Sequence, residues 1–491
     1  MPTNLAIDGP STIRAAVATG IGQACRLATT MTGTVVLSRL LSPTDFGLAA
    51  MLAPVVAFAA LLQDMGLTQA AVQRSKVTDE HLSALFYVSV GVSLALALAM
   101  IATSPVVAAF YQRSELTMLT CAFSTTLVLT GAASQPTAIL QRQFRFAALA
   151  WADVLAAIAG LATGVAVAVT WRSYWALFAG PVVYALVQLA IVWISARWKP
   201  GPPDFGHGFR QLIGFGGKVT TSNILNFVSR NADNVLIGRY AGSLQLGYYD
   251  RAYRLLLFPQ AQLNAPLSRV MFPTLSRLQG DDLRYRSTYV ACVGMILTLA
   301  QPGTLFVLTH AHTIVPLVLG RQWSSAADIF AWLGISALYQ PFTSTIGWLF
   351  LSQARTTEYI KIAIYCTATT ILSFVVGLRW GALGVATAYC ISDYVLRAPV
   401  LIWVAGRSGP VRRRDLCAIG IAHALSLSAA VAASFVMDVV WPYTSLATVF
   451  AKIIVTYVAY VGALFLSRNG RALIGRVHST IGLLRAGASG V

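Results

Sequence analysis

Charged residues are scarce in this sequence, and acidic residues are the scarcest. Only 11% of the 491 residues are charged, against about 25% in a typical soluble domain. Asp and Glu number 17 against 35 Lys and Arg, which gives a formal net charge of +18. Because 57% of the residues are hydrophobic and the mean hydropathy is +0.68, we expect an all-α integral membrane protein. Basic cytoplasmic loops then account for the positive charge, and no nucleic-acid partner is expected.

Motifs for cofactor or metal chemistry are also missing from the sequence. The six cysteines have no C-x-x-C spacing, so neither a disulfide framework nor a zinc site is expected. The segment Gly214–Lys218 (GFGGK) lacks the spacing of a phosphate loop, which argues against ATP-driven transport. We therefore predict no cofactor. His310 and His312 are expected at a membrane interface, and the polar N-terminus predicts no cleaved signal peptide.

Long apolar runs dominate what the sequence does contain. Fourteen runs of about 20 residues are long enough to cross a bilayer as helices. They lie near residues 15–38, 46–70, 82–104, 116–140, 147–170, 174–196, 211–238, 246–272, 286–309, 326–352, 359–378, 382–405, 416–437 and 446–467. The Pro- and Gly-rich connection Arg197–Arg210 separates the sixth run from the seventh. We predict one six-helix bundle over residues 1–200, a second over 201–406, and two further helices with a basic tail over 407–491.

Basic residues between the predicted spans are distributed unequally. With the N-terminus in the cytoplasm, twenty-one Lys and Arg fall on the cytoplasmic side and six on the opposite side. The six are Arg39, Arg113, Arg172, Arg239, Arg321 and Arg379. Since cytoplasmic loops carry the excess of Lys and Arg, both termini are expected in the cytoplasm.

An internal repeat appears at an offset of 200 residues. Five residues of the first half recur in the second: Val35, Arg39, Gly47, Phe58 and Leu67 match Val235, Arg239, Gly247, Phe258 and Leu267. The two copies cross the membrane in the same direction because six spans separate them. Such parallel repeats predict a pseudo-twofold axis along the membrane normal, with a site near the bilayer midplane.

Polar residues form a stripe along the predicted span at Lys218–Tyr240. Ser222, Asn226, Arg230 and Asp233 recur at helical spacing and therefore share one face. Two readings stay open: Arg230 and Asp233 pair with each other, or the stripe lines a polar cavity. The first span carries a matching stripe in Gln23, Arg26 and Thr30, and this match favours the cavity.

Arginines outnumber acids in the predicted spans 1, 7 and 8, which favours an anionic ligand, because the guanidinium group can bind two oxygens at once. The candidate binding residues are Arg26, Arg230, Arg251, Arg254, Asn226 and Gln23. Asp250 and Arg254 are spaced i, i+4 and form an alternative ion pair. Asp153, Asp328 and Lys452 lie near span ends and are expected to reach the headgroups. Asp393 and Arg397 share a helix face.

Several short motifs make the chain similar to a known family. Residues Ser38–Arg74 contain an Arg-x-Leu-x-Pro-x-x-Phe-Gly turn, an Asp-x-Gly-Leu sequence and a closing Gln. The segments Asp233–Leu255, Met271–Leu278, Leu319–Trp323 and Trp380–Tyr389 also fit. By their order and spacing the chain resembles the Wzx-like oligosaccharide flippases, a polysaccharide transporter family, and within it the exporters of exopolysaccharides of the succinoglycan or colanic-acid kind.

This resemblance implies two six-helix bundles around a cavity, with two extra helices. It implies that undecaprenyl-pyrophosphate-linked oligosaccharides cross the bacterial inner membrane, driven by a proton or sodium gradient, with cavity arginines binding the pyrophosphate. Asp64, Asp233 and Asp393 are the candidates for ion coupling. Membrane lipids, and possible pathway proteins such as a polysaccharide polymerase and a chain-length regulator, are the implied partners.

Two other functions remain as alternatives. A drug or cation antiporter of the same fold would need a cavity dominated by carboxylates, whereas these spans carry more arginine than acid. An enzyme such as a membrane-embedded polysaccharide polymerase would be expected to carry a large periplasmic loop, and an acyltransferase a membrane-facing catalytic histidine. His423 is the one histidine well inside a predicted span. The flippase ranks first, the antiporter second and the enzyme last.

Overall fold

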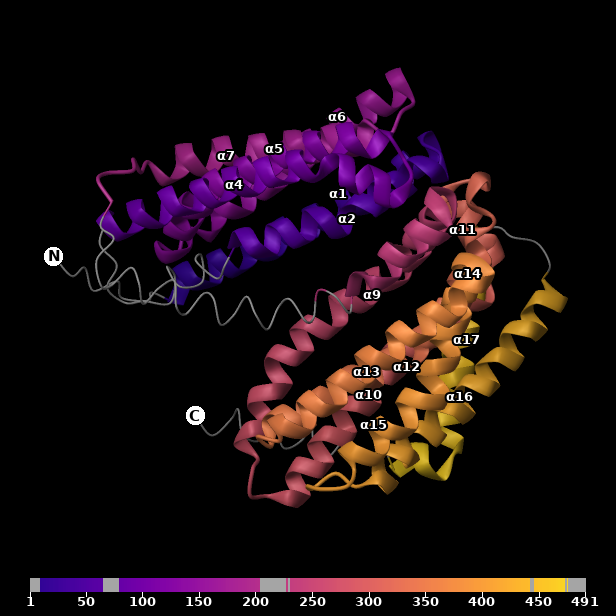
Figure 1. Cartoon of the computed structure of the whole chain (residues 1–491). Coiled ribbons are helices and arrows are strands. Elements are labelled where there is room, and N and C mark those ends of the chain that lie inside the picture. Colours follow the sequence, from indigo (N-terminus) through magenta and orange to yellow (C-terminus); the bar gives the residue numbers. More distant parts are fainter. Residues whose placement is uncertain are drawn as a thin grey trace. The chain divides into compact units, whose positions relative to one another are not determined.

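The computed structural model describes residues 9–64, 79–203, 227, 230–441, 446–472 and 475, and this part of the chain is helical and contains no strand (Figure 1). The helices are α1 (Gly9–Leu40), α2 (Pro43–Asp64), α4 (Asp79–Tyr111), α5 (Glu115–Arg142), α6 (Phe146–Trp171), α7 (Ala176–Ala196), α9 (Gly242–Arg277), α10 (Asp282–Thr309), α11 (Ala311–Leu319), α12 (Ala326–Ser352), α13 (Thr356–Gly377), α14 (Gly381–Ser392), α15 (Ala398–Ala405), α16 (Arg413–Val440) and α17 (Leu446–Leu466). Residues 230–240 are helical as well.

The predicted all-α membrane architecture is confirmed. Within the described residues, nine helical stretches are long and apolar enough to cross a bilayer. Every predicted span except the seventh coincides with a described helix, including α1, α9 and α12. Most of the seventh span, 211–238, lies outside the described residues, so the count of fourteen stays a prediction.

The longest of these stretches, Thr356–Ala405, contains two antiparallel helices. The chain reverses at Gly381, whose φ of 68° lies in the left-handed region that glycine adopts without strain. Phe374 of α13 then stacks on Tyr389 of α14 with ring centroids 5.6 Å apart. Beyond α14 the helix passes through a π-helical turn, Asp393–Arg397, and continues as α15. The two spans predicted here are therefore both present.

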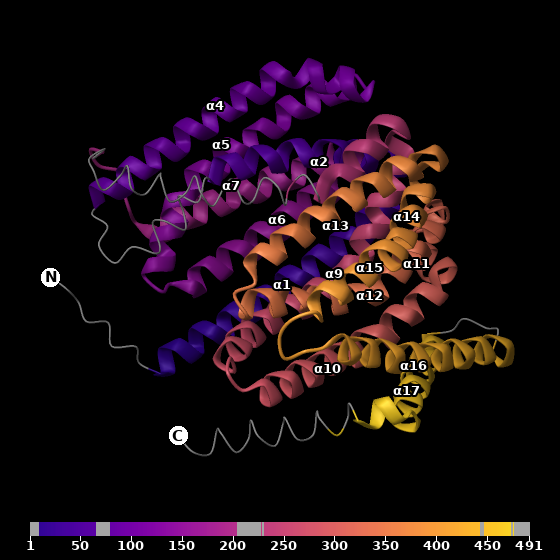
Figure 2. The same ribbon diagram turned by 60° about the horizontal axis from the view of Figure 1, so that its bottom comes forward.

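The chain forms two compact units. Unit 1 comprises Met1–Asp250 and Val318–Gln322, and unit 2 comprises Arg251–Leu317 and Trp323–Val491. In unit 1, α4 lies along α5 and α6 lies along α7 (Figures 1 and 2). In unit 2, α10 contacts α12 and α16, and α16 contacts α17. These units follow packing, whereas the boundary predicted at residue 200 follows the sequence repeat and stays a prediction.

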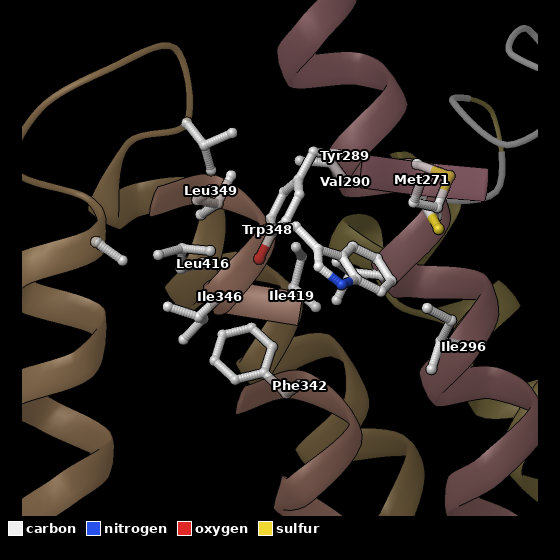
Figure 3. Close-up of a cluster of buried hydrophobic side chains, with 14 of the residues drawn as sticks. Met271, Tyr289, Val290, Ile296, Phe342, Ile346, Trp348, Leu349, Leu416 and Ile419 are labelled. Atoms are coloured by element: carbon white, nitrogen blue, oxygen red, sulfur yellow. The ribbon is translucent and has the colours of Figure 1, made fainter. Parts of the chain in front are cut away.

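A buried cluster in unit 2 joins α9, α10, α12 and α16. Its members include Met271, Tyr289, Phe342, Trp348 and Leu416 (Figure 3). Two of its polar aromatic groups have partners across helices, since Tyr289 hydrogen-bonds Thr345 at 3.1 Å and the Trp348 indole donates to Ser268 at 3.1 Å. The cluster therefore joins these helices through apolar packing and hydrogen-bonded aromatic side chains.

Two repeat-related glycines form a close helix contact within unit 1. A Cβ atom on Gly47 of α2 would overlap the carbonyl oxygen of Ser243, and one on Gly247 of α9 would overlap that of Pro43. Residues 43 and 47 thus contact residues 243 and 247 reciprocally, with an offset of 200. Reciprocal contacts are what a twofold axis between equivalent segments produces, so this contact supports the predicted repeat.

Residues near the ends of the two repeat-related spans also contact other helical segments. Near the end of α1, the Ser38 and Leu41 carbonyls accept hydrogen bonds from Gln322 at 2.6 and 2.9 Å. Near the end of the second copy, Gly238 packs on Tyr111 and the Arg239 guanidinium lies 5.8 Å from the centre of the Phe110 ring. The end of α1 therefore contacts the turn that follows α11, and the end of the second copy contacts the end of α4.

We predict that Gly247→Ala destabilises the protein by about 1–3 kcal/mol, as overpacking does in close-packed interiors. The added methyl group must displace the Pro43 backbone. Thermal unfolding of purified protein measures the effect. Gly91→Ala is the control, because no atom lies within 4 Å of its Cβ position and alanine favours a helix. An unchanged melting temperature for Gly247→Ala would show that the contact can accommodate a methyl group.

Candidate functional site

Arg26 lies in a polar cluster built from three helices of unit 1. Its Nη1 atom is 3.8 Å from the Oδ2 atom of Asp153 on α6. The other carboxylate oxygen of Asp153 accepts hydrogen bonds from the Tyr184 hydroxyl at 3.1 Å and the Gln188 amide at 2.9 Å, both from α7. The carboxylate is therefore fixed on one side by two neutral donors and turned towards the arginine on the other.

This cluster leaves Arg26 accessible. The Arg26 side chain is 53% exposed and that of Asp153 is 33% exposed. A single contact of 3.8 Å is longer than a charge-assisted hydrogen bond and does not use the bidentate fork of the guanidinium group. The remaining N–H groups of Arg26 can therefore donate to an anion while Asp153 holds the charge in place.

Asp153 lies two turns inside α6 and contacts Arg26, a partner that the sequence did not indicate. The expectation that it reaches towards the headgroups stays a prediction. Nothing in the sequence indicated that Tyr184 and Gln188 bind Asp153. A single acid in an apolar helix of 26 residues was the available clue, because a charge inside the membrane needs a partner.

Arg230 and Asp233 do not pair with each other. Asp233 is 6% exposed and accepts hydrogen bonds from the Tyr249 hydroxyl at 3.0 Å and the Asn234 backbone at 2.8 Å. Arg230 is exposed, and no ion pair joins it to Asp233 in the described part of the chain. The geometry therefore excludes an ion pair between Arg230 and Asp233, and the Arg230 side chain is accessible.

The other candidates are placed to different degrees. Gln23 is exposed on α1, three residues before Arg26. Arg251 is partly buried and Arg254 is exposed, both on the part of α9 that belongs to unit 2. Asn226 lies outside the described residues, and of Asp64 only its place as the last residue of α2 is described. That these residues meet in one cavity stays a prediction.

Asp393 forms a buried ion pair with Arg397 in unit 2. Arg397 Nε lies 3.1 Å from Asp393 Oδ1, and the two side chains are 5% and 10% exposed. The guanidinium also donates to the Thr370 hydroxyl and to the Tyr389 carbonyl oxygen, and it lies 4.3 Å from the centre of the Tyr389 ring. The two residues that were predicted to share a helix face therefore form an internal ion pair.

Helices α16 and α17 contribute two further polar contacts. Asp438 of α16 pairs with Lys452 of α17 and, at 3.1 Å, with His310. His423, 1% exposed, hydrogen-bonds the Tyr460 hydroxyl, which donates to Gln301 at 2.6 Å. These contacts attach the last two helices to α10, and they give Lys452 a partner that sequence reasoning did not identify.

We predict that Arg26→Gln weakens pyrophosphate binding at least tenfold, because charge-assisted hydrogen bonds contribute about 1.5–3 kcal/mol. Asp153→Asn should retain binding, and the double variant should bind as weakly as Arg26→Gln. Thermophoresis of purified protein measures the affinity. Arg172→Gln is the control, since Arg172 is an exposed residue that follows α6. Recovery of binding in the double variant would instead assign Arg26 and Asp153 a purely structural role.

Comparisons with known proteins identify relatives that match most of the chain. The chain is 24% identical over 377 residues to the lipopolysaccharide biosynthesis protein WzxC of Escherichia coli K12, covering 74% of this chain and 77% of WzxC. It is 24% identical over 318 residues to the succinoglycan biosynthesis transport protein ExoT of Rhizobium meliloti 1021, covering 64% of each protein.

Solved structures share the fold. The lipid II flippase MurJ superimposes with a TM-score of 0.71 at 13% identity, covering 92% of this chain and 98% of MurJ. A multidrug resistance MATE family transporter superimposes with a TM-score of 0.58 at 14% identity, covering 83% of this chain and 99% of the transporter. At these identities the likeness establishes the fold alone, and it is a fold of membrane transporters.

The family profile described as "Polysaccharide biosynthesis protein" matches residues 36–328. These are 293 of the 491 residues, from 328 − 36 + 1, and therefore more than half of the chain. The protein belongs to this polysaccharide biosynthesis protein family.

Proposed function

We propose that the protein is a flippase for lipid-linked oligosaccharides. It moves undecaprenyl-pyrophosphate-linked repeat units from the cytoplasmic to the periplasmic leaflet of the bacterial inner membrane, with both termini in the cytoplasm. Family membership and the relatives named for lipopolysaccharide and succinoglycan biosynthesis support the sugar class. The fold shared with the lipid II flippase supports a transport mechanism.

The observation that carries the proposal is the exposed guanidinium of Arg26. A lone arginine at the centre of a membrane helix costs about 2.5–3.5 kcal/mol on insertion scales, and Asp153 offsets that cost without covering the side chain. A charge that is kept in the membrane and left accessible suits a transient ligand. Pyrophosphate fits because its oxygens match the planar donors of arginine.

The partners of the acidic side chains argue against the antiporter alternative. A cationic drug needs accessible carboxylates, yet Asp153, Asp393 and Asp438 each lie against a basic side chain. Asp233 is the exception among these four acids, since its hydrogen-bond donors are uncharged and no ion pair involves it in the described part of the chain.

Asp233 is therefore the residue that we propose for ion coupling. A buried carboxylate without a counter-charge is costly in a low-dielectric interior, and binding a proton or a sodium ion removes that cost. Asp393 is already neutralised by Arg397. Alternating access of the two bundles would then transfer the coupled ion and the lipid-linked sugar in turn, and a polysaccharide polymerase and a chain-length regulator would act on the product.

The test is transport by purified protein in proteoliposomes that contain a polyprenyl-pyrophosphate oligosaccharide. Wild-type protein should expose inner-leaflet oligosaccharide to an added glycosidase, and an imposed proton or sodium gradient should accelerate this. Asp233→Asn should lose the acceleration while keeping the slow rate, because only the ion site is changed. Asp282→Asn, an exposed acid at the start of α10, is the control.

No oligosaccharide movement by wild-type protein would contradict the flippase proposal. Equal acceleration of Asp233→Asn and wild type would leave flipping intact and exclude Asp233 as the coupling residue. Movement of a cationic dye in place of the oligosaccharide would favour the antiporter.

A further inference from the structure

An apolar groove of about 720 Å³ runs between α13 and α14 in unit 2. It lies inside the candidate membrane-spanning stretch Thr356–Ala405. Its walls are Thr369, Leu372, Ser373, Val376 and Trp380 from the α13 side and Leu383, Gly384, Thr387, Ala388, Ile391, Ser392, Val395 and Leu396 from the α14 side. The volume is within the range of about 300–1,000 Å³ typical of small-molecule sites.

A glycine contact creates this groove. Cβ atoms on Gly377 or Gly384 would overlap the carbonyl oxygen of the other residue, so the two helix backbones meet there. On α14 the next groove residues at helical spacing, Ala388 and Ser392, are also small. Side chains of this size leave the space beside the crossing unfilled, as small residues do where membrane helices approach closely.

Three of the four hydroxyl groups in the groove donate hydrogen bonds to the backbone of their own helices. Ser373 donates to the Thr370 carbonyl oxygen at 2.7 Å, Thr369 to that of Tyr365 at 2.9 Å, and Thr387 to that of Leu383 at 2.9 Å. These three hydroxyls are therefore satisfied without a ligand, whereas the buried Ser392 hydroxyl has no hydrogen-bond partner among the described residues. The walls offer mainly hydrocarbon, which selects an aliphatic occupant.

The end of the groove at Trp380 carries an aromatic side chain and lies next to a cationic residue. Trp380 is 69% exposed, and tryptophan is enriched at the membrane–water interface. Arg379, the residue before it, is exposed, and no hydrogen bond or ion pair involves it among the described residues. A phospholipid has a negatively charged phosphate next to its acyl chains. The cationic Arg379 suits that phosphate, and the apolar groove next to Trp380 suits an acyl chain.

The length of the groove distinguishes a phospholipid acyl chain from a longer polyprenyl chain. From Thr369 to Trp380 the wall on the α13 side advances by eight residues of α13, which rise about 1.5 Å each, and three residues of a 3₁₀ turn, which rise about 2.0 Å each. Its length is therefore about 18 Å. Half of a hydrocarbon core of about 30 Å is about 15 Å, which is the depth that acyl chains of one leaflet reach. A phospholipid chain therefore fills the groove, whereas a long polyprenyl chain would extend beyond it.

We propose that this groove is a specific site for an anionic membrane phospholipid, with one acyl chain between α13 and α14 and its phosphate at Arg379. The site is separate from the pyrophosphate site proposed above and does not depend on the flippase function. It places a lipid against α13 and α14, next to the π-helical turn that contains the buried Arg397–Asp393 ion pair.

The test is photo-crosslinking of the full chain in liposomes with phosphatidylglycerol that carries a diazirine on one acyl chain. Label should map to residues 369–396. Ala388→Phe, which fills the groove, should reduce labelling at least fivefold, and Thr387→Phe is a second filling variant if Ala388→Phe does not purify. Arg379→Gln should abolish the preference for phosphatidylglycerol over the matching phosphatidylcholine probe. Ile364→Phe is the control, because Ile364 is 64% exposed on α13 and outside the groove.

Three results would overturn the proposal. Labelling that the filling variants leave unchanged would exclude the groove. Equal labelling of all lipid-facing helices would mean ordinary boundary lipid. Stronger labelling by a diazirine polyprenyl phosphate than by phosphatidylglycerol would assign the groove to a polyprenyl chain.

Discussion

A charge inside a bilayer must be compensated, and this constraint explains the placement of three ion pairs that the structure describes. Arg26 lies against Asp153, Arg397 against Asp393 and Lys452 against Asp438, and each pair includes at least one residue of a helix that is apolar enough to cross a bilayer. Moving a single ion from water to such an interior costs several kcal/mol, and close pairing with further hydrogen bonds recovers that cost. Pairing therefore determines which helices must be neighbours: α1 with α6, and α16 with α17.

The pairs differ in accessibility, and this difference separates structural from binding roles. Arg397 is enclosed by a carboxylate, a hydroxyl, a carbonyl oxygen and an aromatic ring, with 5% of its side chain exposed. Such a group has little left to offer a ligand. Arg26 has one long contact and 53% of its side chain exposed, so an anion can reach it. The function proposed for this polysaccharide biosynthesis protein depends on that open pair, while the closed pair stabilises the junction of α13 with α14.

Much of the fold could be predicted from the sequence because hydropathy and loop charge are local properties. Gly47 and Gly247 are one of the five matches from which the repeat was predicted, and the reciprocal contact between their helices supports that prediction. Pairs between helices were harder. The i, i+4 spacing revealed Asp393 and Arg397, but nothing in the sequence placed Asp153 beside Arg26, because that contact joins residues 127 positions apart, from 153 − 26. For the same reason the spacing of Arg230 and Asp233 allowed a pair, whereas Asp233 instead binds Tyr249 on the next helix.

The most direct test of the account is the leaflet in which lipid-linked repeat units accumulate in cells lacking this protein. Membranes from the deletion strain are treated with a membrane-impermeant glycosidase, first as right-side-out spheroplasts and then as inverted vesicles. The account predicts protection in spheroplasts and cleavage in inverted vesicles, with wild-type protein but not Arg26→Gln restoring export. Cleavage in spheroplasts of the deletion strain would show that the units cross the membrane without this protein, and would contradict the flippase assignment.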